Sequence, residues 1–176
     1  MRLKNRKILL TGAAGFIGSH LADELVKNNF VVGYDNLSSG KEELVEHLED
    51  NENFELVISD VLDEEKLNEE MKRCDMVFHL AANPDVSLGA EDTHVHLEQN
   101  ILATYNVLES MRKNEVDEIV FTSTSTVYGE AEQIPTEEDY GPLKPISLYA
   151  SSKLSCEAMI SAYCDNYDMT GVSFRF

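Results

Sequence analysis

The stretch Lys7-Ile-Leu-Leu-Thr-Gly-Ala-Ala-Gly-Phe-Ile-Gly18 decides the fold of this chain. Its apolar β run leads into three glycines spaced Gly-x-x-Gly-x-x-Gly, and helical spacing begins at Phe16. Glycines between a strand and a helix let the backbone turn tightly and approach a phosphate, whose charge the first N–H groups of the helix attract. We therefore expect a pyrophosphate-binding turn formed by Gly12, Gly15, Phe16, Ile17 and Gly18. The alternative is a tight turn that only packs the helix against the sheet.

Outward from this turn, short apolar runs alternate with amphipathic stretches along the whole chain, which is the pattern of βαβ units. Such a pattern predicts an α/β fold, a Rossmann-type doubly wound parallel sheet with helices on both faces. The expected strands are Lys7–Leu10, Val31–Tyr34, Phe54–Ser59, Met76–Leu80, Glu118–Phe121 and Gly171–Phe176. The expected helices are Phe16–Asn28, Lys41–Leu48, a helix capped by Asp63 and ending near Lys72, Thr93–Arg112 and Leu148–Tyr167.

Composition narrows the function classes. The 176 residues contain 33 acidic residues against 14 Lys and Arg, for a formal charge of −19. This charge repels phosphate backbones and anionic lipids, so we expect neither nucleic acid nor a membrane as a partner. Three cysteines without a CxxC pair indicate reduced thiols, and no apolar run is long enough for a signal peptide or a membrane helix, so we expect a cytoplasmic protein. We expect no metal site, because His94 and His96 point to different sides of the predicted helix.

Two carboxylates end predicted strands in places where a dinucleotide would lie. Asp35 ends the second strand, and a carboxylate there accepts hydrogen bonds from ribose hydroxyls and repels a 2′-phosphate. Since Asn36 follows and no arginine stands beside it, NAD is favoured over NADP. Asp60 and Val61 end the third strand, where the carboxylate has the adenine amino group within reach. For each carboxylate the alternative is a structural role, in a turn or near a helix cap.

The segment Tyr149-Ala-Ser-Ser-Lys153 places a phenol and an ammonium at i and i+4, on one face of a predicted helix. A second pair at this spacing, Tyr140 and Lys144, is interrupted by Gly141-Pro142 and cannot share a helix face. A cation beside a shielded phenol favours its ionised form, so Tyr149 is the candidate acid/base. The hydroxyl partner is expected from Ser123, Thr124 or Ser125 at the end of the fifth strand, and spacing alone does not choose among them.

Together these segments resemble the extended short-chain dehydrogenase/reductase family, and in particular its nucleotide-sugar epimerases of the UDP-glucose 4-epimerase type. The resemblance covers the whole chain. Its carriers are Thr11-Gly-Ala-Ala-Gly-Phe-Ile-Gly18, Tyr34-Asp-Asn-Leu-Ser-Ser-Gly40, Ser59-Asp-Val61, Phe78-His-Leu-Ala-Ala82, Asn100, Thr122-Ser-Thr-Ser-Thr-Val-Tyr-Gly129 and Tyr149-Ala-Ser-Ser-Lys153.

The resemblance implies a role for each matching residue. The catalytic hydroxyl falls on Thr124, Tyr149 is the acid/base, and Lys153 binds the nicotinamide ribose and lowers the pKa of the tyrosine. The implied NAD contacts are Gly12, Gly15, Phe16, Ile17, Gly18, Asp35, Asn36, Ser39, Gly40, Asp60, Val61, Leu80, Ala81, Ala82, Asn100, Thr122, Tyr149 and Lys153.

Within that family, the residues after the catalytic hydroxyl separate the reactions. The sugar 4,6-dehydratases carry Asp-Glu there, and this chain has Ser125-Thr126, which favours an epimerase. The resemblance implies epimerisation of a nucleotide-diphosphate sugar, UDP-glucose/UDP-galactose at C4, by transient hydride transfer to NAD. The alternatives are another reductase or dehydrogenase of the family acting on a nucleotide sugar, and a dinucleotide-binding module without catalysis.

The chain ends at Phe176 inside a predicted strand, which a complete domain seldom does. We expect residues 1–176 to be one NAD-binding domain that carries the Thr/Tyr/Lys residues, with a C-terminal substrate domain absent from the chain. The resemblance further implies a UDP-sugar substrate and a homodimer for the complete protein.

Overall fold

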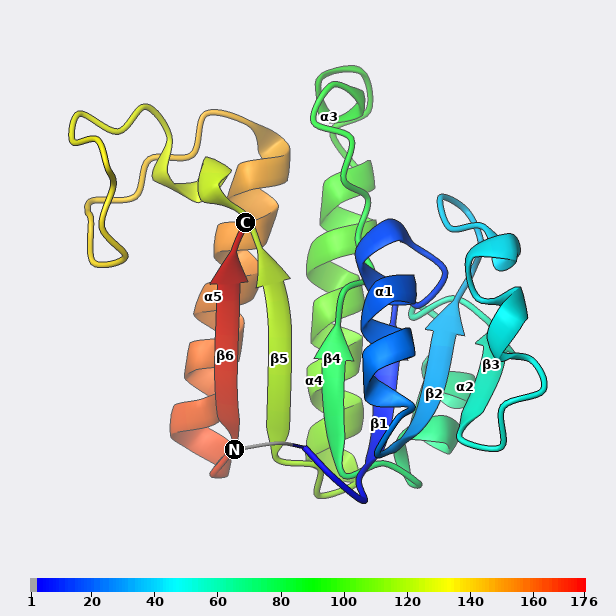
Figure 1. Ribbon diagram of the computed structural model, residues 1–176. Helices are drawn as coiled ribbons and strands as arrows, with labels where there is room; N and C mark the ends of the chain where they lie inside the picture. The colour runs from blue at the N-terminus through cyan, green and yellow to red at the C-terminus, as the bar shows by residue number, and fades with distance from the viewer. Residues whose placement is uncertain (1–2) are drawn as a thin grey trace.

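A computed structural model describes residues 3–176 and contains one parallel sheet with helices on both faces (Figure 1). The strand order is β3-β2-β1-β4-β5-β6, and each paired strand runs parallel to its neighbour. The strands are β1 (Lys7–Thr11), β2 (Phe30–Asp35), β3 (Phe54–Ile58), β4 (Met76–His79), β5 (Glu118–Ser123) and β6 (Thr170–Arg175). This is the doubly wound order, which reverses direction between β1 and β4, and it confirms the predicted fold class.

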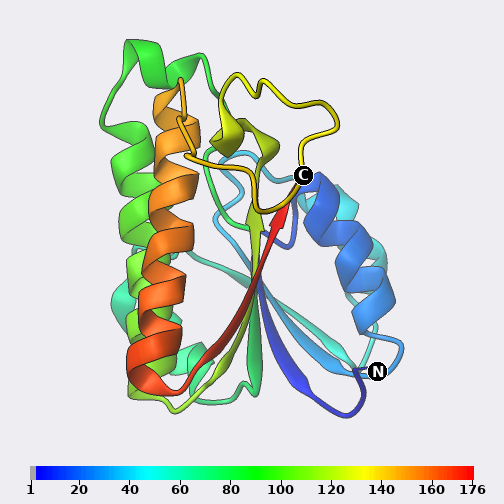
Figure 2. The same ribbon diagram turned by 90° about the vertical axis from the view of Figure 1, so that its left-hand side faces the viewer.

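The helices form two layers, as the edge-on view in Figure 2 shows. One face is covered by α2 (Glu64–Met71), α4 (Ala103–Lys113) and α5 (Leu148–Tyr167), and the other by α1 (Phe16–Leu25). Short segments complete the chain: the 3₁₀ turns η1 (Glu42–Leu44), η2 (Glu46–Leu48) and η4 (Ser125–Tyr128), the one-turn helix α3 (Leu88–Glu91) and the π-helical η3 (Leu97–Leu102).

Alternation along the strands divides the core between these layers. In β1, Ile8 and Leu10 pack into the cluster on the α1 side, whereas Leu9 packs with Val107 and Leu108 of α4 on the other side. A strand buried on both faces must be apolar at nearly every position, which explains why the central strands β1 and β4 stand out in the sequence as continuous apolar runs.

Two predicted helices differ from the structure. Lys41–Leu48 forms η1 and η2 rather than an α-helix, and its side chains are mostly exposed, so little packing holds a regular helix there. Thr93–Arg112 is not one continuous α-helix, because η3 is wound as a π-helix and regular α geometry starts only at α4. The Asp63 cap and α5 agree with prediction: Asp63 accepts from the Lys66 N–H at 3.1 Å, and α5 has the predicted bounds.

Candidate active site

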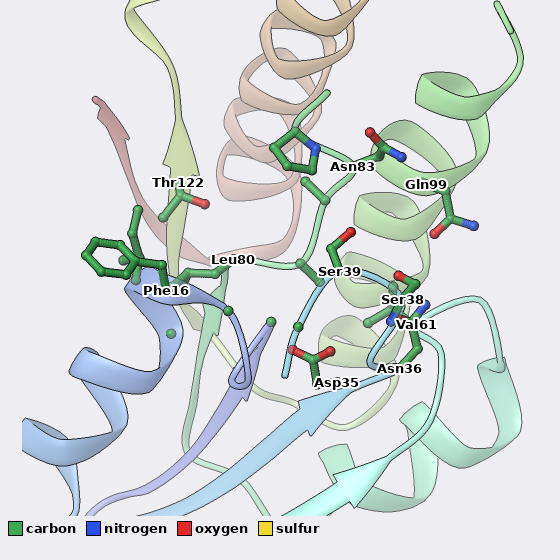
Figure 3. A pocket seen from close by; sticks show the side chains of 18 of the residues that line it. Phe16, Asp35, Asn36, Ser38, Ser39, Val61, Leu80, Asn83, Gln99 and Thr122 are labelled. Carbon is green, nitrogen blue, oxygen red and sulfur yellow. The ribbon is translucent and has the colours of Figure 1, made fainter. Parts of the chain in front are cut away.

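A cavity of about 720 Å³ opens at the carboxyl ends of the strands, on either side of the point where the strand order reverses. Figure 3 shows Asp35 at the end of β2, Leu80 after β4, Thr122 on β5 and Phe16 at the start of α1 around this space. Ligands of open α/β sheets bind at such switch points. The predicted site residues that line it are Gly12, Gly15, Phe16, Ile17, Gly18, Asp35, Asn36, Ser39, Gly40, Asp60, Val61, Leu80, Ala81, Ala82, Thr122, Thr124, Tyr149 and Lys153.

At Gly12 and Gly18 the glycine turn is packed too closely for a side chain. Gly12 has φ +72°, and a Cβ on it would lie 2.8 Å from the Ala81 nitrogen. A Cβ on Gly18 would lie 2.0 Å from the Gly12 carbonyl oxygen, which fixes α1 against the turn. The first turn of α1 begins at Phe16, and the first N–H groups of any helix lack partners within it. The turn therefore presents N–H groups and a positive dipole end to the cavity.

Asp35 is buried and holds the glycine turn in place. Its Oδ2 accepts from the Ala14 N–H at 2.9 Å, and its Oδ1 accepts from the Leu37 N–H at 2.8 Å. Each carboxylate oxygen accepts more than one hydrogen bond, so the group retains capacity for a ribose hydroxyl. The structural role was one of the two sequence alternatives, and the structure shows that it exists whether or not a ribose also binds.

The ends of β2 and β3 are joined across the mouth of the cavity. The Asn36 Nδ2 donates to Asp60 Oδ2 at 2.7 Å, while Asp60 Oδ1 accepts from the Leu62 N–H at 2.9 Å. The Tyr34 hydroxyl donates to the Asp60 carbonyl at 3.2 Å. These bonds fix one wall of the cavity at the positions predicted for adenosine contacts.

Lys153 lies under the opposite end of the cavity with few polar partners. Its Nζ donates to the Thr122 carbonyl at 2.8 Å and lies 4.6 Å from the centre of the Phe121 ring. The residue is only 3% exposed, and burial lowers the pKa of its ammonium from 10.5 to about 8. A buried cation with a single carbonyl acceptor retains two N–H donors for another group.

Tyr149 lies one helical turn before Lys153 and meets Thr124 across the cavity. Burial raises the pKa of the Tyr149 phenol, and a hydrogen bond with the Thr124 side chain acts in the opposite direction. The Lys153 ammonium is directed to the Thr122 carbonyl, and the expectation that it lowers the pKa of Tyr149 stays a prediction. Thr124 itself accepts from the Thr126 N–H at 3.2 Å, and its hydroxyl lies 3.0 Å from that of Thr126.

The three candidates for the hydroxyl partner differ in their contacts and in whether they line the cavity. Thr124 lines the cavity, and its side chain acts to lower the pKa of the Tyr149 phenol. Ser123 lines the cavity as well, but its hydroxyl donates to Glu157, and Ser125 is exposed and does not line the cavity. The choice of Thr124 that the resemblance implied is therefore consistent with the geometry.

Asn100 is the one predicted site residue that does not line the cavity. It is buried behind it, where Oδ1 accepts from the Asn83 N–H at 2.8 Å and Nδ2 donates to Ser152 Oγ at 2.8 Å. Asn100 thus joins the loop after β4 to α5, and the Ser152 hydroxyl in turn donates to the Tyr149 carbonyl at 2.7 Å. This position fits the role that the resemblance implies for Asn100, which is to organise the site through backbone and water contacts, and a contact with the cofactor stays a prediction.

Sequence reasoning missed several residues that line the cavity. Some directly follow or precede a predicted site residue, which is a signal that adjacency could have supplied: Tyr34, Ser38, Ser59 and Asn83. Others have no local signal: Pro84, Gln99 and Phe176.

Nearly the whole sequence matches one family of known proteins. Residues 8–176 match the model of the NAD dependent epimerase/dehydratase family. This chain belongs to that family. Among curated members, the putative UDP-glucose 4-epimerase of Methanocaldococcus jannaschii is 38% identical over 174 residues, which cover 96% of this chain and 54% of that protein.

Solved structures of the epimerase family have the same fold. The UDP-N-acetylglucosamine 4-epimerase from Methanobrevibacter ruminantium M1 superposes with a TM-score of 0.92 at 34% identity, covering 98% of this chain and 55% of that one. The UDP-glucuronic acid 4-epimerase from Bacillus cereus, solved with UDP-glucuronic acid and NAD, gives 0.88 at 36% identity, covering 96% and 55%. The chain spans about half the length of the relatives it matches. No helix in residues 3–176 is long and apolar enough to cross a membrane.

Proposed function

We propose that this chain is the NAD-binding unit of a nucleotide-sugar 4-epimerase and carries its acid/base residues. The observation that carries the proposal is the convergence of the glycine turn, Asp35 and the Thr124–Tyr149–Lys153 group on one cavity. Binding of a dinucleotide alone does not require that group, so its presence supports catalysis over a binding module. The missing Asp-Glu pair after Thr124 argues against a dehydratase.

The residues present fit NAD at both ends of the cavity. The glycine turn, where a Cβ would collide with backbone, leaves room for a pyrophosphate at the N-terminus of α1. Asp35 and Asn36 would hold the adenosine ribose, with Asp60 and Val61 on the adenine side. Lys153 would hold the nicotinamide ribose through the N–H donors that the Thr122 carbonyl leaves free. When bound, NAD supplies a reversible acceptor for hydride.

The protein's own contribution to the reaction is proton transfer at the Tyr149 hydroxyl. We propose that the phenolate oxygen takes the proton of a sugar hydroxyl and later returns it. To act near neutral pH, a phenol must lower its pKa by roughly 3 units, or about 4 kcal/mol. The Thr124 hydrogen bond acts in that direction, against burial, so the cation of Lys153 must contribute once the site is assembled.

For the substrate we propose a UDP-sugar, with the UDP-glucose/UDP-galactose pair at C4 first. The names of the relatives support this class, since they include enzymes for UDP-glucose, UDP-N-acetylglucosamine and UDP-glucuronic acid. We further propose that most sugar contacts belong to a second domain outside residues 1–176, and that the complete protein is a cytoplasmic homodimer. Proximity contributes roughly 7–11 kcal/mol to catalysis, so these residues alone should bind NAD without measurable epimerisation.

Calorimetric titration of the chain with NAD tests the proposal. We expect saturable binding and a rise in melting temperature. At a hundredfold excess of NAD over Kd, binding should add about 2.7 kcal/mol to the free energy of unfolding. Gly18→Ala is the matched variant, because its Cβ meets the Gly12 carbonyl oxygen at 2.0 Å and must disturb the turn. Absence of NAD binding to a folded parent chain would sink the proposal. For the complete protein, cofactor that stays bound through purification favours the epimerase over a reductase that releases it.

A further inference from the structure

The last residue of β6 and the middle of α5 are joined by a bidentate ion pair. The Arg175 Nε donates to Glu157 Oε1 at 3.0 Å, and Nη2 donates to Oε2 at 2.7 Å. The two side chains are 23% and 12% exposed, so the pair is largely shielded from water. Both lie outside the set of residues that line the cavity, and nothing in the proposed reaction uses them directly.

Each partner of this pair is bonded to a further segment beside the site. Glu157 also accepts from the hydroxyl of Ser123, the last residue of β5. The Arg175 Nη1 donates to the Glu138 carbonyl at 3.1 Å, and its guanidinium lies 4.9 Å from the centre of the Tyr128 ring in η4. The pair therefore connects β6, the end of β5, η4 and the long loop before α5.

These contacts connect the strand end that precedes Thr124 with the helix that carries Tyr149. Glu157 is four residues after Lys153 and eight after Tyr149, so all three share one face of α5. Ser123, which Glu157 holds, immediately precedes Thr124. The helix that carries the phenol is thus bonded to the strand end one residue before the Thr124 hydroxyl.

We propose that Arg175 and Glu157 are positioning residues that set the spacing between the Thr124 hydroxyl and the Tyr149 phenol. The inference rests on the proposed role of Tyr149. The positioning role requires a planar guanidinium. Arg175 bonds both carboxylate oxygens of Glu157 and the Glu138 carbonyl at once, and it also lies over the Tyr128 ring. Loss of the pair removes the groups that orient the Glu157 carboxylate, and this weakens the bond that joins Ser123, the neighbour of Thr124, to α5.

The chain contains a matched control for the stability that any such pair supplies. Arg112 also bonds both oxygens of a glutamate, Glu109, at 2.9 Å each, and its guanidinium lies 5.5 Å from the centre of the Tyr167 ring. Glu109 likewise accepts a hydroxyl, that of Tyr163, at 2.8 Å. This pair lies on α4, and none of its members lines the active-site cavity.

The test is the titration of Tyr149 in the 176-residue chain labelled with carbon-13 at the tyrosine Cζ. The chain has seven tyrosines, and Tyr149→Phe assigns the signal. In Arg175→Met we expect the Tyr149 signal to move at pH 7 and its titration midpoint to rise by about half a unit or more, because the Thr124 bond that lowers this pKa is loosened. Arg112→Met should lower the melting temperature without moving the Tyr149 signal.

Ser123→Ala removes the hydrogen bond between residue 123 and Glu157 while leaving the Arg175–Glu157 ion pair intact. We expect this variant to shift the Tyr149 signal in the same direction as Arg175→Met. Arg175→Lys, which keeps the charge and loses the fork, should give a smaller shift. If Arg175→Met does not fold, Glu157→Gln replaces it with the same expectation. A Tyr149 signal that is unchanged in the folded Arg175 or Glu157 variant and in Ser123→Ala overturns the inference. Failure of the parent chain to bind NAD would overturn the proposed function instead. The Tyr149 titration can still be measured in that case, because it does not require NAD.

Discussion

Replacing Lys153 by methionine should stabilise the folded chain near neutral pH while removing a group that the proposed function needs. In the folded chain the Lys153 ammonium is buried, and its contacts are the Thr122 carbonyl and the Phe121 ring. Its pKa is lowered from 10.5 to about 8 by burial, and that lowering corresponds to about 3 kcal/mol. The methionine keeps the unbranched stem and carries no charge, so the penalty disappears in the variant.

The sign of this effect sets its pH dependence. Between pH 8 and 10.5 the unfolded chain holds the proton on Lys153 that the folded chain has lost, so the stability of the parent rises with pH in this window. Below pH 8 the full penalty is present. The difference in unfolding free energy between Lys153→Met and the parent should therefore shrink by about 3 kcal/mol from pH 7 to pH 10.5. Loss of the Thr122 hydrogen bond shifts this difference by a constant and leaves its slope unchanged.

Guanidinium denaturation followed by circular dichroism, at half-unit steps from pH 7 to pH 10.5, measures the difference. Groups that titrate equally in both chains cancel. Lys144→Met, at an exposed lysine in the loop before α5, is the control and should show no such slope. A Lys153→Met difference that is constant over this range would refute the argument that burial of the ammonium is costly. We also expect the stabilised variant to bind NAD more weakly, a trade of function for stability.

Three further outcomes follow from the site. In the complete enzyme, Tyr149→Phe should lower kcat by about 10²–10⁴-fold with little change in NAD affinity, and near-normal turnover would contradict the acid/base role. NAD should bind at least about tenfold more tightly than NADP, or about 1.4 kcal/mol, and Asp35→Ala should narrow that gap; calorimetry that finds equal affinities in the parent chain would exclude the ribose contact. Burial lowers the pKa of His79 to about 3, so the folded chain should lose stability as the pH falls from about 6.5 towards 3, where the unfolded chain takes up the proton. Nitrogen-15 NMR should show a neutral His79 ring at pH 5, and an imidazolium pattern there would contradict the lowering of its pKa by burial.

The strands and their order could be predicted because both faces of the sheet are covered. Ile8 and Leu10 face one helix layer and Leu9 the other, so a central strand such as β1 is a continuous apolar run that ends at a polar residue. The residues at those strand ends, among them Asp35 and Asp60, were therefore recognisable as neighbours from the sequence alone.

The remaining features depend on contacts that have no local signal. The helical spacing over Lys41–Leu48 did not predict two short 3₁₀ turns, because its side chains find little to pack against. The family resemblance singled out Asn100, but it did not reveal that the Asn100 amide bonds Asn83 and Ser152. Nor could spacing predict that burial would dominate the pKa of Tyr149, since that depends on which side chains surround the phenol.

A crystal structure of this chain with NAD tests the central claim most directly. The account predicts the pyrophosphate at the N-terminus of α1 over Gly12 and Gly15, and the adenosine ribose on Asp35. It places the nicotinamide ribose on Lys153, with the ring beside Tyr149. NAD bound outside this cavity, or bound within it with the nicotinamide turned away from Tyr149 and Lys153, would contradict the account.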